Sequence, residues 1–423
     1  MALSFKLFTI SNIEPAMTQL KLTGEVRRNT LLLSGLQALG GANPAVIVAL
    51  GGLVGEALSH NEKIATLPVS LFNMGMAIGI LPAAWVMRKL GRRGGYFIGS
   101  LLGVLGGLTA FTGIVQTSFL IFCVGTVIAG LYSSYVQSYR FAAADSVRPE
   151  LRPRAISWVM IGGLAAAVIG AQVILHTAEI IPGIPFAGTF FAQAALAALA
   201  LPLIWALRTD ALHAQPSHHQ DGGRPLGLIL LNPRLIIAII AGMVAYSLMS
   251  FMMTAAPLAM VHHGHSMRDS TLGIQWHILA MFGPSFITGH LIRRFGKITI
   301  TIVGMVLLAA ASLAALSGLS VPYFWASLIL LGIGWNFGFI GATTLVTDCY
   351  HHHERNKVQA VNDFLVFGSV ALSSFSSGRL LAIYGWDGIN IWSLPIVAIT
   401  IILLLGLGWY ERHHRSHILH TST

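Results

Sequence analysis

Charged residues are scarce in this sequence. Asp, Glu, Lys and Arg make up 9% of the 423 residues, whereas hydrophobic residues make up 55%. A soluble domain carries about 25% charged residues, so this chain has too few polar side chains to cover a surface that faces water. The composition excludes an ordinary soluble protein and predicts one that is embedded in lipid.

Several chemical signatures are also missing. Only two cysteines are present, Cys123 and Cys349, and both fall within or at the end of apolar stretches, so no extracellular disulfide framework is expected. There is no Gly-rich phosphate loop of the Walker type, which argues against an ATP-driven pump. No nucleophile, base and acid constellation points to an enzyme. The 17 histidines do not combine with cysteine or carboxylate at zinc spacing, so we expect neither metal nor cofactor.

Long apolar runs dominate what is present. A membrane-spanning helix needs about 20 mostly apolar residues, and the sequence contains a series of such windows. They predict an all-α membrane protein with twelve transmembrane helices, at residues 29–52, 66–87, 95–115, 118–145, 155–176, 186–207, 235–260, 271–292, 298–318, 322–347, 357–384 and 388–410.

The positive charges lie mostly on one side of this arrangement. Of the 25 Lys and Arg residues, Lys63, Arg268 and Arg379 fall on one side and Arg140 lies within a helix, which leaves the other 21 on the opposite side. Short loops rich in Lys and Arg stay in the cytoplasm. This rule predicts that both termini are cytoplasmic, and it explains the net charge of +10 without a nucleic-acid partner.

A polar segment, "RTDALHAQPSHHQDGGRP", separates the sixth window from the seventh. The first 28 residues lack the apolar core and cleavage site of a secretory signal. We therefore expect a cytoplasmic tail at 1–28, a six-helix bundle at 29–207, a cytoplasmic linker at 208–234, a second six-helix bundle at 235–410 and a cytoplasmic tail at 411–423.

The two halves repeat each other in two short segments. "VMRKLGRR" follows the second window and "LIRRFGK" follows the eighth, 205 residues later; "ADSVRPELRPRA" and "TDCYHHHERNKV" align at an offset of 203. The matched pairs are Arg88 with Arg293, Lys89 with Arg294, Gly91 with Gly296, Arg92 with Lys297, and Asp145 with Asp348. Internal repeats are common in transporters, so we expect two pseudo-symmetric bundles.

These features resemble the major facilitator superfamily of secondary transporters over nearly the whole chain. The family motif Gly-x-x-x-Asp-Arg-x-Gly-Arg-Arg is matched at Lys89, Gly91, Arg92 and Arg93. Arg88 stands where the family has aspartate, and Ala84 where it has the first glycine. An arginine cannot brace a helix N-terminus electrostatically as the family aspartate is thought to do, so that detail of the gate differs here.

The basic "RPELRPRA" segment also looks like this family. "YRFAAAD" and "KVQAVNDFLVFG" are similar to segments of a bacterial branch that includes proposed riboflavin transporters. The resemblance implies a multi-pass protein of the bacterial inner membrane, in which helices one, four, seven and ten line the transport path.

The loop "RKLGRRGG" has two interpretations. It is either a plain cluster of cytoplasmic charges or a hinge, with Gly91 permitting a tight turn. In the second case its cations would hold a carboxylate on a neighbouring helix when the cytoplasmic side is closed, and Asp145 is the nearest candidate. Asp348 occupies the repeat-related position.

Arg140 is a charge inside a predicted membrane helix, and such charges face a bundle interior or a wet cavity. Asp363, in the polar eleventh window, has a matched depth. Three roles for Arg140 stay open: a permanent structural ion pair, direct contact with the solute, or a gate pair with Asp363 across the two bundles. Asp363 is also a candidate proton carrier, since burial penalises a charged carboxylate.

Polar and aromatic residues within the windows mark the expected binding cavity. Each is individually more often ordinary packing, but together they favour a flat or ring-bearing solute. The candidates are Gln37, Asn43, Asn73, Tyr132, Tyr135, Gln137, Tyr139, Arg140, Tyr246, Gln275, His277, Trp335 and Asn336.

The sequence therefore predicts a secondary active transporter that moves a small neutral or anionic solute by alternating access, with proton symport open. The partners are the solute, the lipid bilayer and, if coupled, protons, and we expect a monomer. A drug or metabolite efflux pump of the same fold, a non-transporting membrane receptor and a membrane-embedded enzyme are the alternatives. The absence of an extramembrane domain disfavours the receptor.

Overall fold

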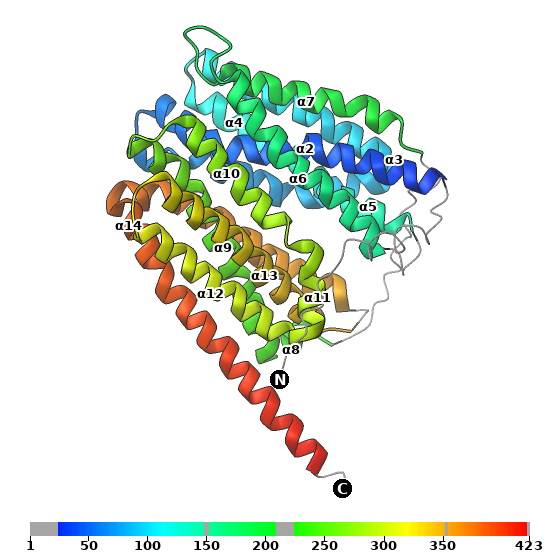
Figure 1. Cartoon of the computed structure of the whole chain (residues 1–423). Coiled ribbons are helices and arrows are strands. Elements are labelled where there is room, and N and C mark those ends of the chain that lie inside the picture. Colours follow the sequence, from blue (N-terminus) through cyan, green and yellow to red (C-terminus); the bar gives the residue numbers. More distant parts are fainter. Residues whose placement is uncertain (1–23, 148–151, 209–223, 352–353, 421–423) are drawn as a thin grey trace, which may run out of the picture.

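Helices are the only regular secondary structure in residues 24–147, 152–208, 224–351 and 354–420, the parts of the chain that the computed structural model describes (Figure 1). The first half contains α2 (Gly24–Ser59), the short 3-10 helix η2 (Glu62–Ile64), α3 (Leu67–Val115), α4 (Phe119–Val136), α5 (Tyr139–Asp145), α6 (Arg152–Thr177) and α7 (Ala187–Trp205). The second half contains α8 (Leu226–Leu230), α9 (Pro233–His262), α10 (Met267–Phe282), α11 (Ser285–Phe295), α12 (Lys297–Leu316), α13 (Val321–Thr347) and α14 (Arg355–His420).

These helices account for the twelve predicted windows. Among the described residues, nine helical stretches are long and apolar enough to cross a membrane. Two of them, 54 and 57 residues long, contain a glycine outside helical geometry, Gly91 (φ 71°) or Gly385 (φ 69°), so each consists of two crossing helices. The window at 271–292 appears as α10 and α11, each too short to cross alone. The all-α class with twelve crossing segments is confirmed.

Two windows predicted as continuous helices are interrupted. The window at 118–145 divides into α4 and α5 at Gln137 and Ser138, and the Ser138 hydroxyl donates to the Tyr135 carbonyl at 2.7 Å. The window at 271–292 divides at Gly283 and Pro284, where proline has no N–H for the helical ladder. Both breaks lie near the ends that carry the basic loops, which we call the basic end.

The boundaries of the terminal segments and the linker also differ from the windows. Helix α2 already begins at Gly24, and α14 continues to His420, so helix extends into both expected tails. The expected linker contains the short helix α8 and the first residues of α9. Residues 1–23 and 421–423, most of the linker at 209–223, and the loop at 148–151 lie outside the described residues.

The helices form two groups that meet along a few helix pairs. In Figure 1, α2 to α7 lie together above α9 to α14. The principal contacts between the groups join α2 to α9, α3 to α14 and α6 to α10. By contrast, the principal contacts of α5 and α11, at the basic end, are with helices of their own group. The two halves are therefore held together mainly away from the basic end.

Small residues allow the helices within a group to approach closely. A Cβ added to Gly125 of α4 would lie 2.5 Å from the backbone nitrogen of Ala110 in α3, so glycine is required for this backbone contact. In the second half, Gly334 of α13 also lies close to Gly304 of α12, since a Cβ added to Gly334 would be 3.0 Å from the Gly304 carbonyl oxygen. Close packing of small residues is how helices associate in lipid, where the hydrophobic effect gives no drive.

Candidate functional site

An aromatic cluster surrounds Tyr246 of α9. Its ring lies edge-on to Phe339 at 5.0 Å, to Trp335 at 5.3 Å and to Phe367 at 5.7 Å, measured between ring centroids. Trp335 also stacks on Phe339 at 5.4 Å with an interplanar angle of 16°, and Phe282 lies edge-on to Trp335 at 6.4 Å. Helices α9, α10, α13 and α14 thus bring aromatic faces together in the second half.

Arg140 of α5 brings a positive charge from the first half towards this cluster. Its guanidinium lies 4.9 Å from the ring of Phe141, and its buried Nε has no hydrogen-bond partner. Tyr246 and Asp363, both in the second half, are close enough to interact with it electrostatically. Arg140 is therefore directed at the surface between the halves.

Asp363 lies exposed on α14 and accepts a hydrogen bond from the Asn362 amide at 3.0 Å. It interacts electrostatically with Arg140, yet no ion pair within 4.0 Å joins these two described residues. In this conformation the two charges are neighbours without direct contact. The gate pair between them stays a prediction, as does solute contact by Arg140.

Six buried polar atoms in the candidate set have no hydrogen-bond partner among the described residues. They are the hydroxyl oxygens of Tyr132 and Tyr139, Nε of Arg140, Oε1 of Gln275, Nε2 of His277 and Nε1 of Trp335. An unpaired buried donor or acceptor costs about 1–3 kcal/mol, so each is a position where a ligand or a water gains from binding. Of these atoms, Nε1 of Trp335 belongs to the aromatic cluster, and Arg140 interacts electrostatically with Tyr246 of that cluster, so both donors lie near its aromatic surface.

Two amides from the candidate set have their hydrogen bonds satisfied within their own half. Asn43 donates to the Ala129 carbonyl at 3.0 Å and to Ser133 at 2.8 Å, and accepts from Gln193. Asn336 donates to the Met281 carbonyl and to Ser285, and accepts from Thr288 at 2.6 Å. Asn43 joins α2, α4 and α7, whereas Asn336 joins α13 to α10 and α11 across the Pro284 break.

Other candidate residues pack inside one half. Tyr132 lies against Gly40 and Gly103, and Tyr135 against Gly99. Tyr139 meets Tyr96 edge-on at 4.8 Å. His277 is fully buried, with Nδ1 2.7 Å from the Leu328 carbonyl. Gln37 lies at the contact of α2 with α6, beside Gly162, and Gln137 is exposed at the end of α4.

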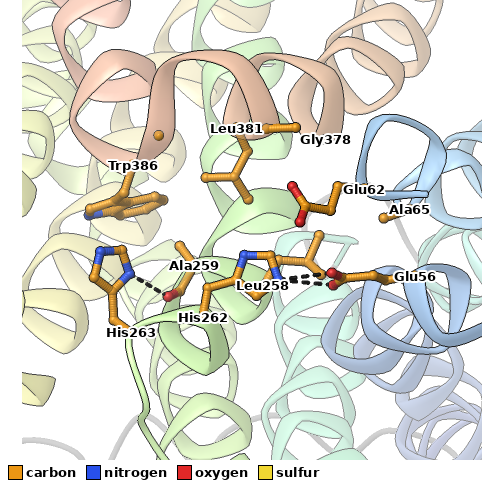
Figure 2. Close-up of a pocket in the computed structure, with 12 residues that line it drawn as sticks. Glu56, Glu62, Ala65, Leu258, Ala259, His262, His263, Gly378, Leu381 and Trp386 are labelled. Carbon is orange, nitrogen blue, oxygen red and sulfur yellow. Dashed lines mark hydrogen bonds and ion pairs between the residues drawn. The ribbon is translucent and has the colours of Figure 1, made fainter. Parts of the chain in front are cut away.

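Polar contacts between the halves lie at the end opposite the basic loops, which we call the closed end. Asn73 of α3 donates to Ser374 of α14 at 2.8 Å, and the Gly378 backbone N–H donates to Thr66 at 3.1 Å. Nearest the loops of the closed end, Nε2 of His262 lies 3.0 Å from both carboxylate oxygens of Glu56 (Figure 2). Three layers of contact therefore join the first half to the second.

At the basic end the described ion pairs lie within each half instead. Arg92 pairs with Asp145 in the first half, and in the second half Lys297 and Arg234 pair with Asp348 at 2.5 and 2.8 Å. Arg92 and Lys297 are repeat-related, as are the two aspartates, so the structure brings together the residues that the repeat matched.

The remaining cations of the loop motif lie on the surface. The ammonium group of Lys89 lies 4.1 Å from the centre of the Trp85 ring, and the guanidinium of Arg93 lies 5.8 Å from that of Trp205. Arg88, which stands in the place of the family aspartate, is exposed.

Several residues of these contacts were not predicted from the sequence. Glu354, whose side chain is fully buried, accepts from Nε and Nη2 of Arg224 at 2.9 and 2.8 Å and from the His351 backbone N–H. The Arg224 guanidinium, helped by the His351 N–H, holds the pKa of Glu354 well below its usual range. This cluster fixes the end of the linker to the start of α14, and its only sequence signal is a lone acid in a histidine-rich loop.

Comparison with known proteins gives a consistent assignment. The sequence profile of the Major Facilitator Superfamily matches residues 30–374 and 279–421. The riboflavin transporter RfnT of Brucella anthropi is 54% identical over 379 residues, which cover 90% of this chain and 95% of that protein. The uncharacterized transporter YddS of Bacillus subtilis is 29% identical over 433 residues, covering 97% and 99%.

Solved structures share the fold at low identity. The nucleoside transporter NupG has a TM-score of 0.66 at 14% identity, covering 89% of this chain and 99% of that one. The xylose transporter XylE of E. coli, in a partially occluded inward-open conformation, has a TM-score of 0.67 at 13% identity, covering 90% and 97%.

Proposed function

Because the chain belongs to the Major Facilitator Superfamily, we propose that it carries riboflavin, or a flavin of closely similar shape, across the bacterial inner membrane by alternating access. The chain is a transporter of this superfamily; its substrate, its membrane and its mechanism are the proposal. The observation that carries the substrate class is the aromatic cluster around Tyr246, which faces the unpaired guanidinium of Arg140.

The chemistry of the cluster suits a flat ring system with polar edges. Tyr246, Trp335 and Phe339 offer edge and face contacts to an aromatic ligand. Arg140 and Trp335 hold unused donors, which match ring carbonyl oxygens. The relative that is 54% identical is a riboflavin transporter, which narrows the ring-bearing class to flavins.

Alternating access is supported by the uneven distribution of contacts. The closed end carries cross-half hydrogen bonds from Glu56, Thr66 and Asn73, whereas α5 and α11 at the basic end contact mainly their own half. With the basic loops cytoplasmic, this arrangement is an inward-facing state with cytoplasmic termini. Opening the closed end and closing the basic end, where Arg140 and Asp363 would meet, gives the second state.

Uptake by proteoliposomes tests the proposal. The purified protein is reconstituted, and accumulation and counterflow of radiolabelled riboflavin are measured with and without a pH gradient. Saturable counterflow is expected, and accumulation that depends on the gradient would add proton symport through Asp363. Saturable binding without transport would show a receptor. If, in a thermal-shift screen, other vitamins, nucleosides or organic acids raise the unfolding midpoint and flavins do not, the proposed substrate is wrong.

A matched pair of tryptophan variants localises the site. Trp335→Leu removes the stacked ring beside Tyr246, and we expect KM for riboflavin to rise about two- to ten-fold, the worth of one aromatic contact. Trp392→Leu alters a side chain that is 58% exposed on α14 and is expected to leave KM unchanged. Equal effects of the two variants would place the binding site elsewhere.

A further inference from the structure

The contact between Glu56 and His262 joins the two halves at the closed end. Glu56 lies near the end of α2 and His262 is the last residue of α9, 206 residues apart in the sequence. The side chains are 27% and 39% exposed, so both are within reach of water and protons. Any motion that opens this end must separate them.

The small pocket around this pair holds few other titratable groups. Among its lining residues in the described chain, Glu56, Glu62, His262 and His263 can titrate; α14 contributes Gly378, Leu381 and Trp386, which cannot. The other ionisable residues near this end, outside the lining, are His60, Lys63, His176, Glu179, His265, Arg268, Asp269, Tyr323, Arg379, Tyr384 and Asp387.

The two histidines of the pocket have different partners. Figure 2 shows His262 turned to Glu56 by two contacts, whereas His263 lies apart below Trp386 and contacts the Ala259 carbonyl of its own helix at 2.7 Å. Glu62 belongs to η2, in the first half, as does Glu56. Among these lining residues, His262 is therefore the one titratable group of the second half that contacts an acid of the first.

We propose that Glu56 and His262 form a proton-binding site that stabilises the closed end, so that a proton on His262 favours the inward-facing conformation. Histidine changes charge between pH 5 and 8. While His262 is protonated and Glu56 is ionised, a hydrogen bond between opposite charges joins the halves. When the imidazole loses its proton, a weaker hydrogen bond to the carboxylate remains, without the attraction between opposite charges. Closure and protonation are thus linked.

The inference rests on the proposed alternating access but not on the identity of the solute. Its test therefore reads conformation and not transport. Nitroxide labels are placed on Ala57→Cys in α2 and Ser320→Cys before α13, both exposed positions at the closed end, in a Cys123→Ala and Cys349→Ala background. Pulsed electron paramagnetic resonance then gives the ratio of short to long distances at pH 5.5 and pH 8.

In the labelled protein without further changes, we expect the ratio of closed to open molecules to fall about two- to five-fold from pH 5.5 to pH 8. A change of this size corresponds to the free energy of one partly exposed ion pair. His262→Gln keeps a donor but cannot titrate, so the pH response should disappear; Glu56→Gln should remove it as well. His263→Gln is the matched control and should preserve it.

Three results would overturn the proposal: no pH response in the labelled protein, a full response in both His262→Gln and Glu56→Gln, or loss of the response in His263→Gln. A failure of the proposed function looks different, because riboflavin counterflow would then be absent while the pH response of the distances persisted.

Discussion

Gly91 and Gly296 adopt the same left-handed backbone conformation at equivalent positions of the two halves. The angles are φ 71° and ψ 167° at Gly91, and φ 89° and ψ 155° at Gly296. Each glycine turns the chain between two antiparallel helices, and each is followed by a cation, Arg92 or Lys297, that reaches the aspartate of its own half. The repeat is therefore preserved in conformation and in charge pairing, not only in sequence.

Replacing either glycine with alanine should destabilise the protein through the backbone alone. This region of φ and ψ is essentially restricted to glycine and costs other residues about 1–3 kcal/mol, while the space around both positions is open. We expect Gly91→Ala and Gly296→Ala each to lower the thermal unfolding midpoint in detergent. Gly289→Ala, at an equally open helical position of α11, should leave the midpoint unchanged or raise it; a fall of similar size there would contradict the explanation.

The repeat-related aspartates should differ in their importance for stability. Asp348 pairs with both Arg234 and Lys297, whereas the described partner of the more exposed Asp145 is Arg92. Asp348→Asn removes two ion pairs, although Arg234 keeps Glu411 at 3.3 Å. It should therefore lower the unfolding midpoint more than Asp145→Asn, with each lost pair worth at most about 1 kcal/mol at this exposure. The difference should shrink in concentrated salt. A midpoint gap that does not respond to salt would mean that packing, not charge, separates the two variants.

Glu354 should make stability depend on pH in the acid range. Arg224 and the His351 N–H hold the pKa of Glu354 in the folded protein below the usual range. The ionised side chain therefore contributes fully to the free energy of unfolding above its pKa in the unfolded chain, about 4.3. This contribution is lost as the pH falls from there towards the lower pKa of the folded protein. Glu354→Gln should lower the unfolding midpoint at pH 7 and flatten its fall below about pH 4.3. The exposed Asp387→Asn serves as control, and an acid limb unchanged in Glu354→Gln would refute this role.

The helices and their repeat could be predicted because lipid imposes a simple rule. A spanning segment must be apolar and about 20 residues long, so composition alone located the twelve crossings. The breaks at Gln137 and Pro284 could not be located in the same way, since the window average does not register one residue whose hydrogen bond is missing. A tight turn at Gly91 is one of two interpretations that the sequence allows for this loop, because glycine permits that conformation.

The site was harder to predict because polarity in a membrane helix shows that a side chain needs a partner, without showing which one. Asn43 and Asn336 are polar residues within apolar windows, which is typical of cavity residues. In the structure, however, neighbouring helices satisfy the hydrogen bonds of both amides. Trp335 and Tyr246 were named individually, but their contacts with Phe339 and Phe367 depend on how α9, α13 and α14 cross. Such contacts follow from tertiary packing, which a single sequence does not encode locally.

Arg140 and Asp363 should be energetically coupled although they do not touch in this conformation. Asp363→Asn removes the acid that interacts electrostatically with the Arg140 charge, so this single change should slow riboflavin uptake strongly, as should Arg140→Gln. In the double variant neither charge remains uncompensated. We therefore expect its uptake rate to exceed the product of the two single effects, with a coupling of about 0.5–3 kcal/mol.

The control cycle pairs Asp363→Asn with Arg293→Gln, an exposed residue of α11, for which the two effects should simply multiply. Thermal midpoints of all variants separate lost transport from lost folding. If Arg140→Gln and Asp363→Asn also multiply, the two charges act independently, and Arg140 is left with direct contact to the solute as its role.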